Sequence, residues 1–246
     1  MRRLLLSLAS IGLVAGFLAT PSASAQQSVN FFLGGFSPTP ADARGSGDGR
    51  NDILVKDFDF LSYRFDRFKG VTVGGEYLVG LGDFFEAGAG IGYYQQTVPA
   101  FDINFQNANG GGNINADLKL RIVPFNATFR VLPLGHRAPI VPYIGAGIGV
   151  FGWRYSESGQ FVDYPASGPL PRNPALFNRT FSSSGVATGP VVLGGIRVPI
   201  GPMAPGFEVR WQSAKGNLST DPVDGFAAPN IDLGGVSYLF TFAVRF

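Results

Sequence analysis

Few side chains in this sequence could carry out catalysis. The 246 residues contain a single histidine, His136, and no cysteine, which excludes disulfides, thiolate metal sites and cysteine nucleophiles. His136 lies in Gly135-His136-Arg137, which has the composition of a turn. Because a nucleophile needs a neighbouring base, and no second histidine exists, no Ser–His pair can be assembled elsewhere. The sequence therefore predicts a protein that is not an enzyme.

A glycine motif and a Gly/Asp-rich loop could suggest cofactor or metal binding. Gly147–Gly152 matches G-x-G-x-x-G, which binds dinucleotides where a strand gives way to a helix. Here Trp153-Arg154-Tyr155 continues a strand pattern, so we expect the glycines to make room for bulky neighbours or to relieve curvature. Gly45–Asp52 lacks the spacing of an EF-hand. No cofactor and no metal are expected.

Charged side chains that recur on one face of alternating segments are the main chemical feature. They are Glu76, Glu86, Lys119, Arg121, Arg130, Arg197, Glu208, Arg210 and Arg245. Charges away from water must pair, so in a narrow interior these groups should interlock as an ion-pair plug. Glu76 and Glu86 are the expected partners of Arg121, Arg130 and Arg210. The alternative is that the same charges gate a narrow pore.

The elements that would position these charges are strands, because apolar residues recur with period two. Eight segments have this pattern: Val29–Phe36, Val71–Val79, Phe84–Gln95, Leu118–Leu132, Ile140–Tyr155, Val186–Ile200, Phe207–Ala214 and Val236–Phe246. In the fourth segment the polar positions change parity at Val123-Pro124. Such a change predicts a β-bulge, where proline is tolerated.

The connections between these segments alternate strictly between long and short. The long ones are Ser37–Gly70, Gln96–Asp117, Ser156–Gly185 and Lys215–Gly235, and the short ones are Gly80–Asp83, Pro133–Pro139 and Gly201–Pro205. Membrane barrels have short turns on one side and longer loops on the other, with apolar residues facing lipid and polar residues facing the lumen. The pattern therefore predicts an all-β, eight-stranded antiparallel transmembrane β-barrel.

The N-terminal residues have the features of a signal peptide. Arg2 and Arg3 precede an apolar run over Leu4–Leu18, and Ala23-Ser24-Ala25 forms a small-residue cleavage site. We expect residues 1–25 to be removed and residues 26–246 to form the barrel domain. Without the two arginines the chain has equal numbers of acidic and basic residues, so no nucleic-acid partner is expected.

Two segments resemble the OmpA/OmpX-type small outer-membrane barrels and the related porin-family β-barrel domain. They are Pro142–Gly149 and the terminal strand Phe240–Phe246 with its aromatic end. The resemblance covers nearly all of residues 26–246. It implies a location in the outer membrane, contact with its lipid, and export through the periplasm. It also implies that the barrel-assembly machinery reads a C-terminal signal made of Phe240, Phe242, Val244 and Phe246.

Three functions are consistent with such a barrel. The first is a structural or surface-interaction role, in which long exposed loops contact an extracellular ligand. These loops are rich in aromatic residues, namely Tyr63, Phe65, Phe68, Phe101, Phe105, Phe161, Tyr164, Phe177 and Phe181. These could serve binding or pack over the barrel mouth. The second is a narrow passive channel for ions or small solutes. The third is a lipid-modifying enzyme, which the lone histidine disfavours.

Overall fold

Eight antiparallel strands close into a β-barrel in the computed structural model, which describes residues 26–44, 51–106, 113–163, 175–219 and 225–246. Around the ring the order is β4-β3-β1-β11-β8-β7-β6-β5, and β5 pairs with β4 to close it. The barrel strands are β1 (Gln27–Pro38), β3 (Gly70–Gly80), β4 (Phe85–Gln106), β5 (Asn113–Val131), β6 (Val141–Asp163), β7 (Ala175–Arg197), β8 (Met203–Gln212) and β11 (Gly235–Arg245). The predicted fold class is confirmed.

Short elements lie between the barrel strands at the long-loop end. They are η1 (Ala41–Ala43), α2 (Ile53–Lys56), η2 (Asp57–Asp59), β2 (Leu61–Ser62), η3 (Phe65–Phe68), β9 (Lys215–Asn217) and β10 (Asn230–Asp232). β2 adds to the edge of β4, and β9 pairs with β10. In the part of the chain that the structure describes, no helix is long and apolar enough to cross a bilayer. The predicted signal peptide, residues 1–25, lies outside the described residues.

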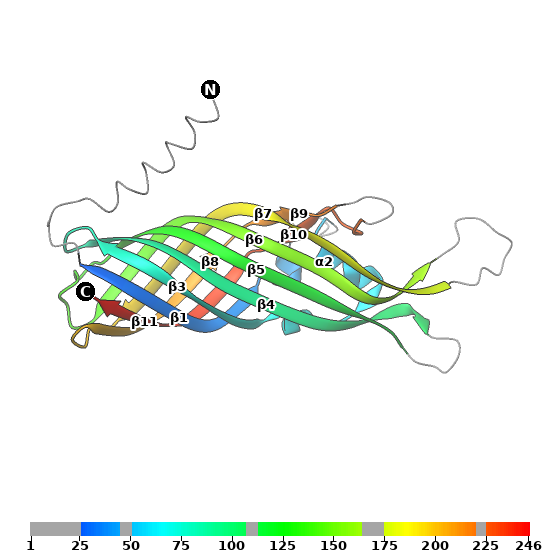
Figure 1. Cartoon of the computed structure of the whole chain (residues 1–246), viewed down its shortest axis with the longest axis horizontal. Coiled ribbons are helices and arrows are strands. Elements are labelled where there is room, and N and C mark those ends of the chain that lie inside the picture. The colour runs from blue at the N-terminus through cyan, green and yellow to red at the C-terminus, as the bar shows by residue number, and fades with distance from the viewer. Residues whose placement is uncertain (1–25, 45–50, 107–112, 164–174, 220–224) are drawn as a thin grey trace, which may run out of the picture.

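Four neighbouring strands are much longer than the sequence pattern predicts. β4, β5, β6 and β7 have 22, 19, 23 and 23 residues, whereas β1, β3, β8 and β11 have 10 to 12. β4 continues eleven residues beyond Gln95, its predicted end. The long strands form a curved wall that projects beyond the short strands, at the end opposite both β1's start and the C-terminus (Figure 1). The barrel is therefore elongated toward the long-loop side.

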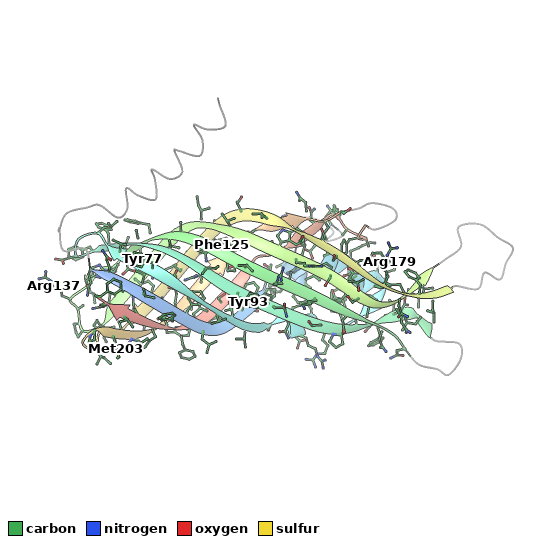
Figure 2. The ribbon with its side chains drawn as sticks, viewed as in Figure 1. Tyr77, Tyr93, Phe125, Arg137, Arg179 and Met203 are labelled. Carbon is green, nitrogen blue, oxygen red and sulfur yellow. The ribbon has the colours of Figure 1, made fainter. Side chains whose placement is uncertain are left out.

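Two kinds of outer surface follow one another along these strands. In the part of the barrel on the side of β1's start and the C-terminus, the outward residues are apolar and exposed. Figure 2 shows Tyr77, Tyr93 and Phe125 as examples. On β5 the outward residues from Val123 to Val131 are apolar, and those from Asn115 to Arg121 are polar. A span of nine residues matches the length that a tilted strand of about 9–11 residues needs to cross a bilayer. The apolar band is therefore the membrane-spanning part.

The predicted bulge at Val123-Pro124 is wrong. β5 keeps one register with β6 from Ala116↔Gly159 to Val131↔Ile144, so the same parity faces inward throughout. The inward residues change from apolar Ile122 to polar Asn126, while the outward ones change from Arg121 to Phe125. The parity switch in the sequence arises because the strand passes from lipid to water, which inverts the required polarity of both faces.

Candidate functional site

Six charged side chains lie buried and paired in the lumen of the membrane-spanning part. This lumen cluster consists of Glu76, Glu86, Glu208, Arg130, Arg197 and Arg210, all buried. Arg130 donates to Glu76 at 2.7 Å and lies 3.3 Å from Glu208 and 3.4 Å from Glu86. The three carboxylates and three guanidinium groups balance, so the cluster is formally neutral. Removing charge from water is costly unless it is paired, and here every member is.

The other contacts of the lumen cluster tie six strands together. Arg210 on β8 contacts Glu76 at 2.8 Å and Glu208 at 2.6 Å, and Arg197 on β7 contacts Glu86 on β4 at 2.7 Å. The Tyr143 ring lies beneath the guanidinium groups of both Arg130 and Arg197, at 5.1 and 4.6 Å. Its hydroxyl donates to Glu208 at 3.0 Å. Such a cation–π stack holds the arginines in place at the same time as the ion pairs.

Inward glycines leave the space that this cluster occupies. A Cβ on Gly90 would lie 2.4 Å from Cγ of Glu76, and one on Gly145 would lie 2.9 Å from Cγ of Arg130. Gly145 belongs to β6, whose glycines include the G-x-G-x-x-G match. β6 continues as a strand from these glycines to Asp163, so the helix that must directly follow the glycines of a dinucleotide site is missing there.

Two of the predicted lumen residues lie elsewhere, and a third lies at the edge of the lumen cluster. Lys119 and Arg121 are on the outward face of β5, exposed, and above the apolar band, so their assignment to the lumen is wrong. They share parity with Val123 and Phe125, and the assumed bulge had placed them inside. Arg245 is half-buried at the end of β11, beside the cluster rather than in it. The expected pairing of Arg121 with Glu76 or Glu86 is therefore wrong as well.

A second, apolar core fills the barrel mouth above the membrane. This mouth core contains Ile53 and Leu54 of α2 packed against inward residues of the long strands, including Leu118, Leu120, Ile122, Phe151, Trp153 and Tyr155. The Phe68 side chain is fully buried there, and Tyr63 and Phe65 pack against it. The loop aromatics between β1 and β3 therefore cover the mouth. Phe105 and Tyr164 fall among side chains that the structure does not describe.

Buried polar groups fix this loop in the mouth, and the sequence pattern did not indicate them. Arg44 pairs with Asp52 at 3.0 Å and also donates to the backbone carbonyl of Asp232 at 3.1 Å. Asp52 in turn caps α2 through the amide of Leu54 at 3.0 Å. This network joins the first long loop to β10. The only signal for it in the sequence is an Arg and an Asp in one loop, which is common in exposed turns.

Two buried carboxyl groups meet above the mouth core. Tyr155 donates to Asp57 at 2.9 Å, and Glu157 follows on the same inward face of β6. Burial raises the pKa of Glu157 to about 7. Burial, and next the adjacent Glu157 carboxylate, raise the pKa of Asp57 well above its usual range. The parity shared by Trp153, Tyr155 and Glu157 could have placed Glu157 inside, had the longer strand been predicted.

A cavity separates the lumen cluster from the mouth core. This small cavity at mid-height is lined by Phe32, Thr72, Tyr94, Asn126 and Arg210 among others, and has room for about one water molecule. At the short-turn end of the barrel, opposite the mouth, an apolar layer is formed by Leu132, Val141, Tyr143 and Leu193. His136 lies in the short turn there, with Nε2 3.3 Å from the carbonyl of Phe85. Among the described residues no group of acidic and histidine side chains could hold a metal ion.

Several solved structures resemble this chain in architecture. Outer membrane protein OprG from Pseudomonas aeruginosa is 10% identical, with 90% of this chain and 96% of that chain covered and a TM-score of 0.47. The attachment invasion locus protein Ail of Yersinia pestis, in complex with the heparin analogue sucrose octasulfate, is 11% identical, with 90% and 99% covered and a TM-score of 0.36. Neisserial surface protein A is 12% identical, with 89% and 95% covered and a TM-score of 0.38. No protein-family model and no curated protein matches the chain.

Proposed function

We propose that this outer-membrane β-barrel protein has a structural or surface-interaction role, carried by the part that projects above the membrane. What supports this most directly is that the lumen cluster below and the mouth core above both lie buried in the barrel interior. Eight strands enclose a lumen just wide enough for side chains. Transport would need the side chains of the lumen cluster and the mouth core to move aside. A surface role needs no such movement.

The projecting wall offers an exposed apolar group for such contacts. Phe60, Phe101 and Ile103 are 46%, 42% and 51% exposed, and they meet where β2 adds to β4. The amide of Ile103 donates to the carbonyl of Phe60 at 3.0 Å, and Ser62 pairs with Phe101. Exposed apolar side chains gathered in one place are typical of interaction sites. We name these three residues the tip patch and propose that an extracellular ligand contacts it.

Planar-bilayer recording tests the absence of transport. We expect no steady single-channel conductance from the refolded protein. A reproducible conductance would contradict the surface role and favour the second candidate, a narrow passive channel for ions or small solutes. What favours the channel is the polar lining of the mid-height cavity, where Thr72, Asn126 and Arg210 lie.

Cell-surface assays test the tip patch. Cells that carry the protein with Phe60, Phe101 and Ile103 all replaced by serine should autoaggregate and adhere to polystyrene less than cells with the native protein. The control replaces Phe31, Ile91 and Ile148 with alanine. These three residues are exposed within the apolar band. Equal adhesion by native and tip-patch variants, at equal surface levels, would argue against this site.

A further inference from the structure

Three basic side chains lie together on the outer surface, immediately above the apolar band. Arg121 on β5 is paired directly with Arg154 on β6, and Lys119 lies two residues further along the same outward face of β5. All three are exposed. We call them the basic triad. Because the strands keep their register here, the two guanidinium groups start from neighbouring backbone positions on one face of the sheet.

The height of the basic triad coincides with the end of the apolar surface. In the next outward row of the sheet toward the membrane, the residues are Tyr93, Val123 and Gly152. The row after that includes Phe125, which is 51% exposed. The hydroxyl of Tyr93 donates to Gln95 at 3.0 Å. Aromatic residues of this kind mark the interface of a membrane barrel. The basic triad therefore lies at the level of the lipid head groups rather than in open solvent.

The triad has no acidic counterpart in its own rows of the sheet. Beside Arg121 and Arg154 the outward neighbours are Gln95 on β4 and Ser184 on β7, and beside Lys119 they are Thr97, Ser156 and Ser182. Within the described residues, the contact made by Arg154 is with Ser182 at 3.4 Å. Like charges directly opposite on a sheet destabilise it, so an anion that bridges them is favoured.

We propose that the basic triad binds the phosphate group of an outer-leaflet lipid head group. Two adjacent guanidinium groups can donate several hydrogen bonds to one phosphate, and arginine is the side chain best suited to this geometry. Lys119 adds a third positive charge on the side away from the membrane. Gln95, Ser182 and Ser184 supply neutral donors to the sugar or glycerol part. The site depends on the barrel's placement in the membrane and not on its proposed surface role.

A comparison of vesicles tests the site. The protein is refolded in phosphatidylcholine vesicles that contain either lipid A, a phosphorylated glycolipid, or the same lipid with its phosphates removed. We expect the native protein to unfold at a higher temperature with the phosphorylated form. Arg121→Gln combined with Arg154→Gln should abolish this difference and weaken lipid retention in native mass spectrometry about tenfold, which corresponds to about 1.4 kcal/mol.

Two controls make the result decisive. Replacing Arg137 and Lys215 with glutamine removes the same charge elsewhere on the surface, and Arg137 lies at the opposite end of the barrel (Figure 2). This variant should keep the native difference; an equal loss would show a net-charge effect and overturn the site. Inorganic pyrophosphate added to vesicles with the dephosphorylated lipid should give no comparable gain. If it does, a soluble anion rather than a lipid occupies the triad, and the proposal is wrong.

Discussion

Each acidic residue of the lumen cluster holds more than one partner, so single substitutions should act strongly. Glu76 accepts from Arg130, Arg210 and Asn30, at 2.7, 2.8 and 3.2 Å. Deleting one member of a buried ion-pair group leaves opposite charge without compensation, which is costlier than never having had the pair. Because the lumen cluster has as many carboxylates as guanidinium groups, removing any one of its six members should destabilise the protein.

Glu76→Ala should lower the free energy of unfolding by about 3–5 kcal/mol, because two arginines lose their shared carboxylate. Glu76→Gln should cost less, since the amide oxygen still accepts one hydrogen bond. Urea unfolding in detergent measures both values, with the exposed Asp83→Ala as control. An Ala variant as stable as the native protein would mean that Glu76 is outside the lumen.

The buried carboxyl pair above the mouth should make the extracellular part sensitive to pH. The folded-state pKa of Glu157 is about 7, above the usual value, because burial disfavours the charged form. A raised folded pKa means stability that is fully present at acid pH and lost as pH rises from the unfolded value through about 7. Protection of the mouth from proteolysis should therefore fall between about pH 4.5 and 7.

Glu157→Gln should flatten that dependence, because the amide stays neutral at every pH. The exposed Asp117→Asn on β5 should leave it unchanged. Limited proteolysis of the reconstituted protein across this range measures both. A steep fall that persists in Glu157→Gln would assign the effect to another group, and Asp57, with its own raised pKa, would be tested next.

At the scale of elements, the sequence predicted all eight barrel strands but not the ends of the long ones. Alternation of apolar and polar residues is visible wherever one face meets lipid and the other meets charge. Beyond Arg121 and Arg154 the alternation continues, but the polar residues are now on the outward face and the apolar residues on the inward face. In the sequence this change of parity looks the same as a β-bulge, although the strand is regular. Ile53 and Leu54 were missed for another reason, since a four-residue helix has too few positions to show a period.

The last strand should be the element on which assembly depends most. β11 pairs with both β1, the first strand, and β8, and the amide of Phe246 donates to the carbonyl of Gln27 at 3.0 Å. Phe246 is 69% exposed on the outer surface, so it does not pack in the core, and we expect it to serve recognition or anchoring. Deleting Phe246, or replacing it with Asp, should impair insertion. Outer-membrane levels and heat-modifiable gel mobility measure this, and Phe207→Ala serves as control.

Taken as a whole, the molecule has two cores of opposite character stacked along one axis. The lumen cluster is held by charge, and the mouth core by apolar packing. Leu54→Ala should therefore loosen the mouth, where large-to-small changes cost about 2–5 kcal/mol, while the membrane part stays folded. Faster proteolysis with unchanged heat-modifiable mobility is the expected result, and loss of both together would show that the two cores unfold as one.

The mature chain should begin at Gln26, which is the residue just before β1. N-terminal sequencing of protein taken from the outer membrane measures this directly. An N-terminus that retains Leu4–Leu18 would contradict the predicted cleavage after Ala25.

The polar rows above the apolar band also bear on how irreversible insertion is. We expect Lys119, Arg121 and Arg154 to cross the hydrocarbon once during insertion, on the hairpins that become the projecting wall. An Arg or Lys at the midplane of a bilayer costs about 2–4 kcal/mol. The same cost opposes any return after the mouth core has formed outside. We therefore expect these charged side chains to slow any return of the hairpins through the membrane.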